Sequence, residues 1–175
     1  MANRTEVRIG GSGGQGVVLA AQILGKAAVL DGKNVLQTQA YGAEARGSLA
    51  KSEVIISDTK IGFPAVREPD ILVAMNQDAL KVLLKDLKEN GTLIVDSTNV
   101  TTIPETKAQV HKLPITETAK KTFGETLYAN MVMLGGFTKI TKLVTVKSME
   151  ETIRANVSKR TVETNVSAFK KGLQL

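Results

Sequence analysis

Short apolar runs alternate along this chain with longer segments in which apolar residues recur at helical spacing. Continuous apolar runs are typical of buried strands, and recurrence about every three or four residues is typical of helices. The runs predict strands at about residues 7–9, 34–39, 51–57, 70–75, 92–96 and 108–113. The helical spacing predicts helices at about residues 15–30, 78–88, 116–123, 127–140, 148–156 and 162–171.

Apolar strands with helices between them predict an α/β fold, a three-layer α/β/α sandwich around a largely parallel sheet. No helical segment separates the strands at 34–39 and 51–57, so we expect an antiparallel pair there and a mixed sheet. The 175 residues contain no linker or internal repeat, and we expect a single domain over residues 1–175. In such folds ligands meet the carboxyl ends of the strands.

Two helical segments, residues 17–30 and 127–137, are apolar on nearly every face. The second contains Gly135 and Gly136, and glycine inside a helix costs about 1 kcal/mol relative to alanine. We therefore expect another backbone to lie close to these glycines. Together the two segments hold more apolar surface than we expect one small domain to cover, which predicts contacts with other chains.

A glycine-rich loop follows the first strand and leads directly into the first helix. It satisfies the spacing G-x-G-x-x-G through the residues Gly11, Ser12, Gly13, Gly14, Gln15 and Gly16. This Rossmann-like context suits a phosphate, because the first amides of the helix attract an anion. A nicotinamide-binding protein also carries an acid at the end of its second strand. Here that strand ends in amides, so the loop either binds a phosphate of a molecule other than NAD or serves only close packing.

A polar cluster is expected where the strand at 34–39 ends. Its residues are Gln37, Gln39, Tyr41, Glu44 and Arg46. Amides and a guanidinium suit a ligand of mixed polarity or the backbone of a neighbouring chain. The alternative is a surface loop with a weak Glu44–Arg46 ion pair.

Other polar residues have more than one interpretation or a purely structural one. Asn76-Gln77 follows the strand at 70–75 and points to the same edge, although Asn76 alternatively caps the next helix. His111 is the only histidine and is interpreted as a half-exposed strand residue. Three acids at strand borders, Asp58, Asp70 and Asp96, are interpreted as turn and cap residues. Ser148 and Glu151 have the spacing of a capping box.

The amino-acid composition excludes some kinds of site and argues against others. With no Cys, the chain holds no disulfide and no thiolate-ligated zinc or iron–sulfur centre. Aromatic residues make up only 3%, which argues against a platform for nucleic-acid bases. The net charge of +6 arises in residues 101–175, and we interpret it as a solvated face or a surface for an acidic partner. No secretory signal or membrane-spanning run is visible, so we expect a cytoplasmic protein.

Several segments together resemble one family, the γ subunit or γ domain of 2-oxoacid:ferredoxin oxidoreductases. They occur in family order over nearly the whole chain: GSGGQGV at 11–17, QTQ at 37–39, YG at 41–42, EARG at 44–47, SEVIIS at 52–57, PD at 69–70, AMNQ at 74–77 and NMVMLG at 130–135. Each segment is ordinary alone, but the set is specific. The family often has a second Gly after Arg46-Gly47, where this chain has Ser48.

The resemblance implies one subunit of a cytoplasmic complex that oxidatively decarboxylates a 2-oxoacid, with 2-oxoglutarate favoured and pyruvate next. In such a complex thiamine diphosphate and Mg²⁺ lie between α and β subunits, iron–sulfur clusters pass electrons to ferredoxin, and the acyl group passes to coenzyme A. A ferredoxin-like δ subunit is a further expected partner. This chain is expected to hold no catalytic residue, metal or cofactor alone. It would support assembly and coenzyme A binding through the glycine loop with Tyr41, Glu44, Arg46, Asn76 and Gln77.

Two functions of other classes stay open from the residues alone. A free-standing dinucleotide-dependent dehydrogenase would use the glycine loop, but the missing acid after the second strand argues against it. A nucleic-acid-binding module rests on basic charge alone.

Overall fold

The structure is a computed structural model that describes residues 4–41 and 48–175. The strands are β1 (Arg4–Ser12), β2 (Asn34–Tyr41), β3 (Leu49–Ser57), β4 (Ile71–Ala74), β5 (Thr92–Asp96) and β6 (Gln109–Leu113). Within the described ranges they form one six-stranded sheet in the order β2-β3-β1-β4-β5-β6. Strand β3 is antiparallel to both of its neighbours, and the remaining pairs are parallel.

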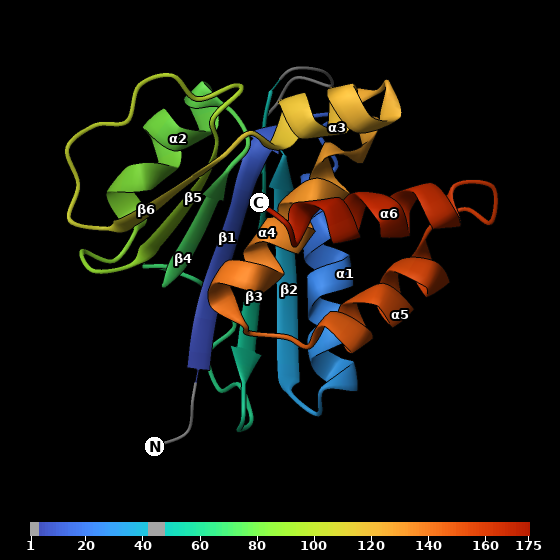
Figure 1. Cartoon of the computed structure of the whole chain (residues 1–175). Helices are drawn as coiled ribbons and strands as arrows, with labels where there is room; N and C mark the ends of the chain where they lie inside the picture. Colours follow the sequence, from blue (N-terminus) through green and yellow to red (C-terminus); the bar gives the residue numbers. More distant parts are fainter. Residues whose placement is uncertain (1–3, 42–47) are drawn as a thin grey trace.

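Helices cover both faces of this sheet (Figure 1). The helices are α1 (Val17–Leu30), α2 (Gln77–Leu83), α3 (Ile115–Phe123), α4 (Ala129–Thr141), α5 (Val146–Asn156) and α6 (Val162–Gly172), with 3-10 turns η1 (Leu84–Asp86) and η2 (Thr126–Tyr128). Helix α2 and η1 pack on one face, and the other helices pack on the opposite face. The α/β sandwich with a mixed sheet is therefore confirmed, including the antiparallel strand predicted after strand 34–39.

The element boundaries differ from the sequence prediction at several ends. Helix α1 begins at Val17 because Gly16 adopts the left-handed conformation, with φ 70°. Strand β2 continues to Tyr41, and α2 ends at Leu83 before tightening into η1. The predicted capping box at Ser148 is wrong, because Thr145 caps α5 and its hydroxyl accepts the Ser148 amide at 3.2 Å.

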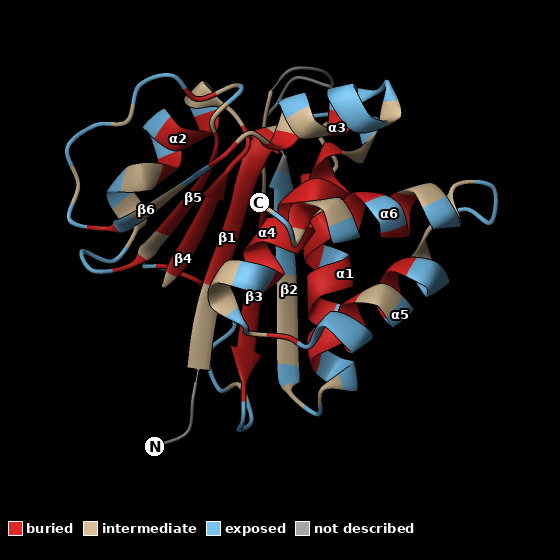
Figure 2. Cartoon of the chain, in the orientation of Figure 1, coloured by how far each residue is buried: buried red, intermediate tan, exposed pale blue. Residues whose placement is uncertain are grey.

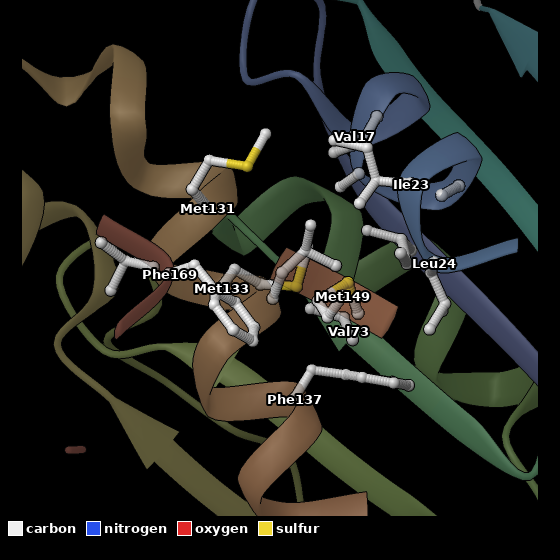
Figure 3. Close-up of a cluster of buried hydrophobic side chains, with 14 of the residues drawn as sticks. Val17, Ile23, Leu24, Val73, Met131, Met133, Phe137, Met149 and Phe169 are labelled. Carbon is white, nitrogen blue, oxygen red and sulfur yellow. The ribbon is translucent and has the colours of Figure 1, made fainter. Parts of the chain in front are cut away.

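The main hydrophobic core lies between the sheet and the helices of the larger layer (Figures 2 and 3). Strand residues such as Val73 meet Ile23 and Leu24 of α1 and Phe137 of α4 there, and all four are fully buried. A smaller cluster lies beneath α2, where Leu80 packs on strands β4 and β5. Among the described residues, no helix has the length and apolar character needed to cross a membrane.

Helices α4 and α6 cross so closely that their backbones touch. A Cβ on Gly135 would lie 2.7 Å from the Cα of Gly172, and a Cβ on Gly172 would lie well inside 3.0 Å of the Val132 carbonyl. The close backbone predicted at these glycines is confirmed at Gly135, where it belongs to this same chain, whereas the close neighbour of Gly136 is the Leu113 side chain. Glycine is required here because any side chain would force the helices apart.

The surplus of apolar helix surface predicted from the sequence is largely absent. Helix α4 is buried from Ala129 to Thr138 by elements of its own chain. Helix α1 buries its sheet-facing side and exposes large apolar side chains mainly at its end, at Val29 and Leu30. The remaining helices of the layer, above all α5 and α6, account for this coverage.

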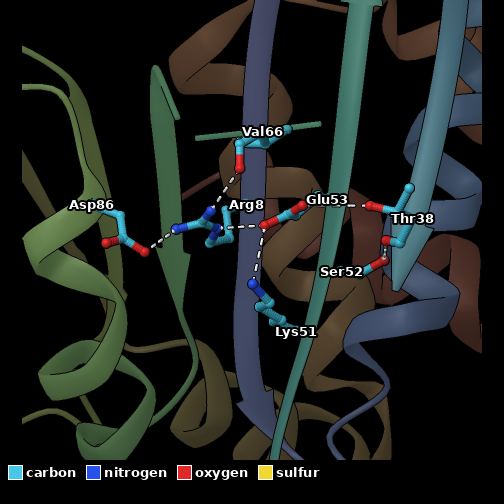
Figure 4. Close-up of polar contacts among 7 residues, drawn as sticks. All are labelled: Arg8, Thr38, Lys51, Ser52, Glu53, Val66 and Asp86. Carbon is cyan, nitrogen blue, oxygen red and sulfur yellow. Dashed lines mark hydrogen bonds and ion pairs between the residues drawn. The ribbon is translucent and has the colours of Figure 1, made fainter. Parts of the chain in front are cut away.

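A buried arginine joins the other face of the sheet to its covering loops (Figure 4). The Arg8 side chain is 3% exposed and donates to Glu53 at 2.8 Å and to Asp86 at 2.6 Å. It also donates to the Val66 carbonyl at 3.1 Å. A buried charge is tolerated only when paired and hydrogen-bonded in this way, and the cluster ties β1 to β3, to η1 and to the segment before β4.

The turn after α1 is fastened to the start of α5 by Asp31. Its carboxylate accepts the Thr145 amide at 2.6 Å and the Ser148 hydroxyl at 2.6 Å. Burial acts to raise the pKa of Asp31, but the hydrogen bonds from Ser148 and Thr145, aided by Lys33, outweigh it and hold the pKa below its ordinary value of 3.8. A negative charge at a helix N-terminus is also favoured by the helix dipole.

Substitution of Gly172 by Ala should lower the free energy of unfolding by about 1–3 kcal/mol, because the added methyl overpacks the α4–α6 crossing. Gly62→Ala is the matched control, since a Cβ there meets nothing within 4 Å. We expect that control to change stability by less than about 0.5 kcal/mol. Urea unfolding of both variants measures the difference, and equal stabilities would contradict the backbone contact.

Replacing Asp31 by Asn should destabilise the protein by about 0.5–2 kcal/mol at pH 7. The reason is that the group which accepts the Thr145 amide and the Ser148 hydroxyl at the start of α5 then has no charge. A group whose pKa is lowered by folding contributes stability above its unfolded pKa and loses it as the pH falls. The difference between wild type and variant should therefore shrink once the pH falls below 3.8. Denaturant unfolding between pH 3 and pH 7 measures this, and a pH-independent difference would contradict it.

Candidate functional site

The glycine loop lies at the point where the chain changes direction across the sheet. Strand β1 leads into α1 on one face, and its parallel neighbour β4 leads into α2 on the other. The carboxyl ends of β1 and β4 therefore form a topological switch point, where ligands of open α/β sheets bind. Ser12 ends β1, and Asn76 caps α2 with its side chain accepting the Ala79 amide at 2.8 Å.

The loop turns sharply through two glycines with positive φ. Gly14 has φ 97° with open space around it, and Gly16 has φ 70°. The Gly13 amide donates to the Ser48 carbonyl at 3.1 Å, which fastens the loop to the start of β3. Gly16 provides no side-chain cap to α1, so the first amides of that helix keep their attraction for an anion.

The side chain of Gln15 folds inward beneath the loop. Its Oε1 accepts the Ser12 amide at 2.7 Å and the Asn76 Nδ2 at 3.0 Å, and its Nε2 donates to the Met75 carbonyl at 3.2 Å. The Asn76 Nδ2 also donates to the Ser12 Oγ at 2.6 Å. The space between the ends of β1 and β4 is thus filled by the amide side chains of Gln15 and Asn76. In the described part of the chain, the side of the loop open to a ligand is its outer side, at Gly13 and Gly14, which are exposed.

A hydrogen-bond network continues from this point to the start of α3. The Asn99 Nδ2 donates to the Met75 carbonyl at 3.4 Å and to Asp96 at 2.9 Å. Asp96 is fully buried and accepts the Thr116 hydroxyl at 2.5 Å and the Thr116 amide at 3.2 Å. Its interpretation as a cap residue is confirmed, because its carboxylate satisfies the first turn of α3. Sequence reasoning missed Asn99 and Thr116, which lie in no recognisable motif.

The loop is also held from the side by α4. Asn130 is buried, its Nδ2 lies 3.4 Å from the Gly16 carbonyl, and a Cβ on Gly16 would meet this side chain well inside 3.0 Å. The signal in the sequence was a single polar residue within the apolar run at 129–137, which indicates a buried polar partner.

Neutral amides and hydroxyls dominate these contacts, and the described residues contain no cluster of three His, Cys, Asp or Glu side chains able to hold a metal ion. Asp96 is committed to structural hydrogen bonds. Such an arrangement suits binding of an anion or of another backbone rather than acid–base or nucleophilic chemistry.

A hollow of about 910 Å³ lies at the opposite end of the sheet, where the parallel strands begin. Its lining includes Lys33 and Lys88, which are paired with Asp58 and Asp70. His111 also lines it and is half-buried in β6, as predicted. Because these two lysines are neutralised and no strand-to-helix loop of a switch point opens there, we assign the candidate site to the glycine loop.

Comparison with known proteins agrees with the resemblance noted in the sequence. The model of the family described as pyruvate ferredoxin/flavodoxin oxidoreductase matches residues 6–175. The chain belongs to this family. It is 46% identical to the 2-oxoglutarate synthase subunit KorC of Methanocaldococcus jannaschii, over 98% of this chain and 94% of the relative. It is 47% identical to KorC of Methanothermobacter marburgensis, over 98% and 96%.

A solved structure agrees with the fold as well as with the family. The γ subunit of the keto/oxoacid ferredoxin oxidoreductase from Geobacter sulfurreducens superposes with a TM-score of 0.87 at 40% identity, over 97% of this chain and 96% of that one. The chain is thus a γ-type member of the oxidoreductase family, as the sequence motifs indicated.

The γ-type chain brings together only some of the predicted site residues. Gln77 turns away from the glycine loop, with its Oε1 accepting the Thr101 and Thr102 amides at 3.0 and 3.1 Å. Tyr41 ends β2 and pairs with Ala50 of β3, which in turn pairs with Gly11. Two strand spacings, about 10 Å in all, therefore separate the Tyr41 backbone from the loop.

The rest of the predicted polar cluster is only partly described. Gln37 donates to the Ser52 hydroxyl at 2.8 Å, and Gln39 is exposed on the same strand. Glu44 and Arg46 lie outside the described residues, so their predicted places at the site stay predictions.

Gly16→Ala should destabilise this γ-type chain more than Gly14→Ala does. Both substitutions place alanine at positive φ, a strain of roughly 1–2 kcal/mol, but only the one at Gly16 also collides with Asn130. Adding Asn130→Ala to Gly16→Ala should recover the steric part, with a coupling of at least about 0.5 kcal/mol. Unfolding measurements on all four variants, including Asn130→Ala alone, test this, and strictly additive effects would show that the side chain does not confine the loop.

Proposed function

We propose that this chain is the γ subunit of a 2-oxoglutarate:ferredoxin oxidoreductase. The complex would remove CO₂ from the 2-oxoacid, pass the electrons to ferredoxin and transfer the acyl group to the thiol of coenzyme A. Membership of the family and near full-length similarity to two 2-oxoglutarate synthase subunits support the subunit and its substrate class. Pyruvate is the second candidate substrate, because the sequence resembles the γ subunits of 2-oxoacid:ferredoxin oxidoreductases in general.

The chemistry of the complex is assigned to its other subunits. Iron–sulfur clusters require thiolate ligands, and this chain has no Cys. Thiamine diphosphate and Mg²⁺ are placed between the α and β subunits, and a ferredoxin-like δ subunit is a further proposed partner. The γ subunit would then be inactive alone and would contribute assembly and a binding surface.

We assign that surface to the glycine loop, with a phosphate of coenzyme A as its ligand. The observation that carries this assignment is the exposed turn at Gly13 and Gly14 directly before the uncapped N-terminus of α1, held at the switch point by Gln15 and Asn76. Backbone amides at such a terminus bind an anion without any charged side chain.

The remaining candidate residues take different proposed roles. Tyr41, Glu44 and Arg46 are proposed to line the outer side of the ligand, where a guanidinium can hold a phosphate with two donors. Gln77 would act indirectly, since its hydrogen bonds hold the segment at Thr101 and Thr102 next to the start of α2. The second candidate role of the loop is docking of a partner subunit's backbone.

The assembled complex carrying Gly14→Asp should require at least about fivefold more coenzyme A for half-maximal activity than one carrying Gly14→Asn. Asn and Asp have nearly the same size and the same backbone strain at φ 97°, so the pair isolates the added negative charge. A like charge about 4 Å from a phosphate costs 1 kcal/mol or more even in water. Steady-state kinetics on complexes reconstituted with each variant measures the shift, with the isolated chain as the inactive baseline.

The outcomes separate the two roles of the loop. An equal coenzyme A requirement with a weaker complex in Gly14→Asp would favour docking of a partner subunit over phosphate binding. Equal kinetics and equal assembly in both variants would contradict either role. Oxidoreductase activity of the isolated chain would contradict the proposed function itself.

A further inference from the structure

The two edges of the sheet are built very differently. Strand β6 has five residues, Gln109–Leu113, and carries His111 and the exposed Lys112. Shortness and charge are the usual means by which proteins protect a sheet edge against pairing with another chain. Strand β2 has eight residues, Asn34–Tyr41, with no charged residue and no Pro. Among the described strands, β2 has β3 as its one neighbour.

The unprotected edge is regular and accessible. All eight residues of β2 pair with β3 in unbroken register, from Asn34 opposite Ser57 to Tyr41 opposite Ala50, so no bulge twists the edge away. Thr38, Gln39 and Ala40 are exposed. A row of backbone donors and acceptors on such an edge is a template for a further strand.

We propose that β2 pairs antiparallel with β2 of a second copy of this chain, about a two-fold axis perpendicular to the sheet at Thr38. Directly opposite residues of an antiparallel pair point to the same face of the sheet, so the axis must lie midway between two copies of the same residue. A two-fold axis perpendicular to the sheet also keeps α1 of both copies on the same face. This inference goes beyond the proposed function and does not rest on it.

The side chains of β2 are complementary to themselves in this register. Gln37 of one copy lies opposite Gln39 of the other, and amides can both donate and accept. On the other face Leu36 of one copy lies opposite Ala40 of the other, so two apolar side chains pack against each other. No charged side chain occurs from Asn34 to Tyr41, so the two-fold brings no like charges together, which is the common obstacle to self-pairing.

This register predicts which engineered cysteines can form a disulfide between copies. In the pair the two residues at position 38 lie directly opposite each other, with Cα atoms about 4.5–5.5 Å apart, which a disulfide can span. Two residues at position 39 lie offset by two residues along the strands, about 8 Å apart, which exceeds that reach. The natural chain has no Cys, so each introduced thiol is the only one.

The experiment compares Thr38→Cys, Gln39→Cys and Gln109→Cys in the full chain at equal concentrations under mild oxidation. We expect Thr38→Cys to form covalent dimers at least tenfold faster than either of the others. The wild type, which has no Cys, should sediment as a dimer in analytical ultracentrifugation at micromolar concentrations. Gln39→Cys controls for collision on the same edge, and Gln109→Cys controls for the charged edge.

Thr38→Lys provides a second readout, because it places two like charges opposite each other at the axis. It should weaken the dimer at least tenfold while the melting temperature of the monomer changes little, since Thr38 is exposed and the hydrogen bond that its hydroxyl donates to Glu53 is long, at 3.4 Å. Equal cross-linking rates for the three cysteine variants, or a wild-type monomer at all concentrations, would overturn the proposal. So would a monomer whose β2 amides become protected from hydrogen exchange only when the other oxidoreductase subunits are added, because a partner strand would then be the occupant.

Discussion

One antiparallel strand determines the layout of this molecule. Parallel neighbours need a crossover of a dozen or so residues, and only residues 42–48 connect β2 to β3. Strand β3 must therefore run back beside β2, and its other edge pairs with β1. This arrangement leaves the other edge of β1 to β4, so these two parallel strands meet at the switch point. It also leaves β2 at the end of the sheet, two strands away from the glycine loop.

The second constraint is that glycine is needed at two places, in the glycine loop and at the crossing of α4 and α6, because a side chain there would collide with neighbouring atoms. Gly11 has no Cβ, and one added there would lie 2.7 Å from the Gln15 Oε1. The inward amide of Gln15 can therefore reach both the Ser12 amide and the Met75 carbonyl. In the middle of α4, Gly135 meets Gly172 of α6, and the two glycines allow the helix crossing that closes the core. The glycines thus serve packing and positioning in the same fold.

Much of this fold followed from local patterns, and the site followed only in part. Apolar runs and helical spacing located the strands and helices, because each buries one continuous face. The glycine loop and Asn76 were found because turn chemistry and helix capping are local. Gln77 and Tyr41 were grouped with them because both follow strands, but side-chain direction and strand order depend on tertiary pairing. Asn99, Thr116 and Asn130 were missed since their partners lie far away in the sequence.

The way the core closes decides how this chain can contact others. Because α5 and α6 cover much of the apolar surface of α1 and α4, few large apolar side chains of these helices stay exposed among the described residues, chiefly Val29, Leu30 and Val146. The glycine loop and the β2 edge also offer backbone donors and acceptors, which are directional. Contacts of this kind depend more on the orientation of the partner's backbone than on the partner's amino-acid composition, because hydrogen bonds weaken steeply away from linearity. A subunit that needs one fixed orientation in a larger enzyme is well served by such contacts.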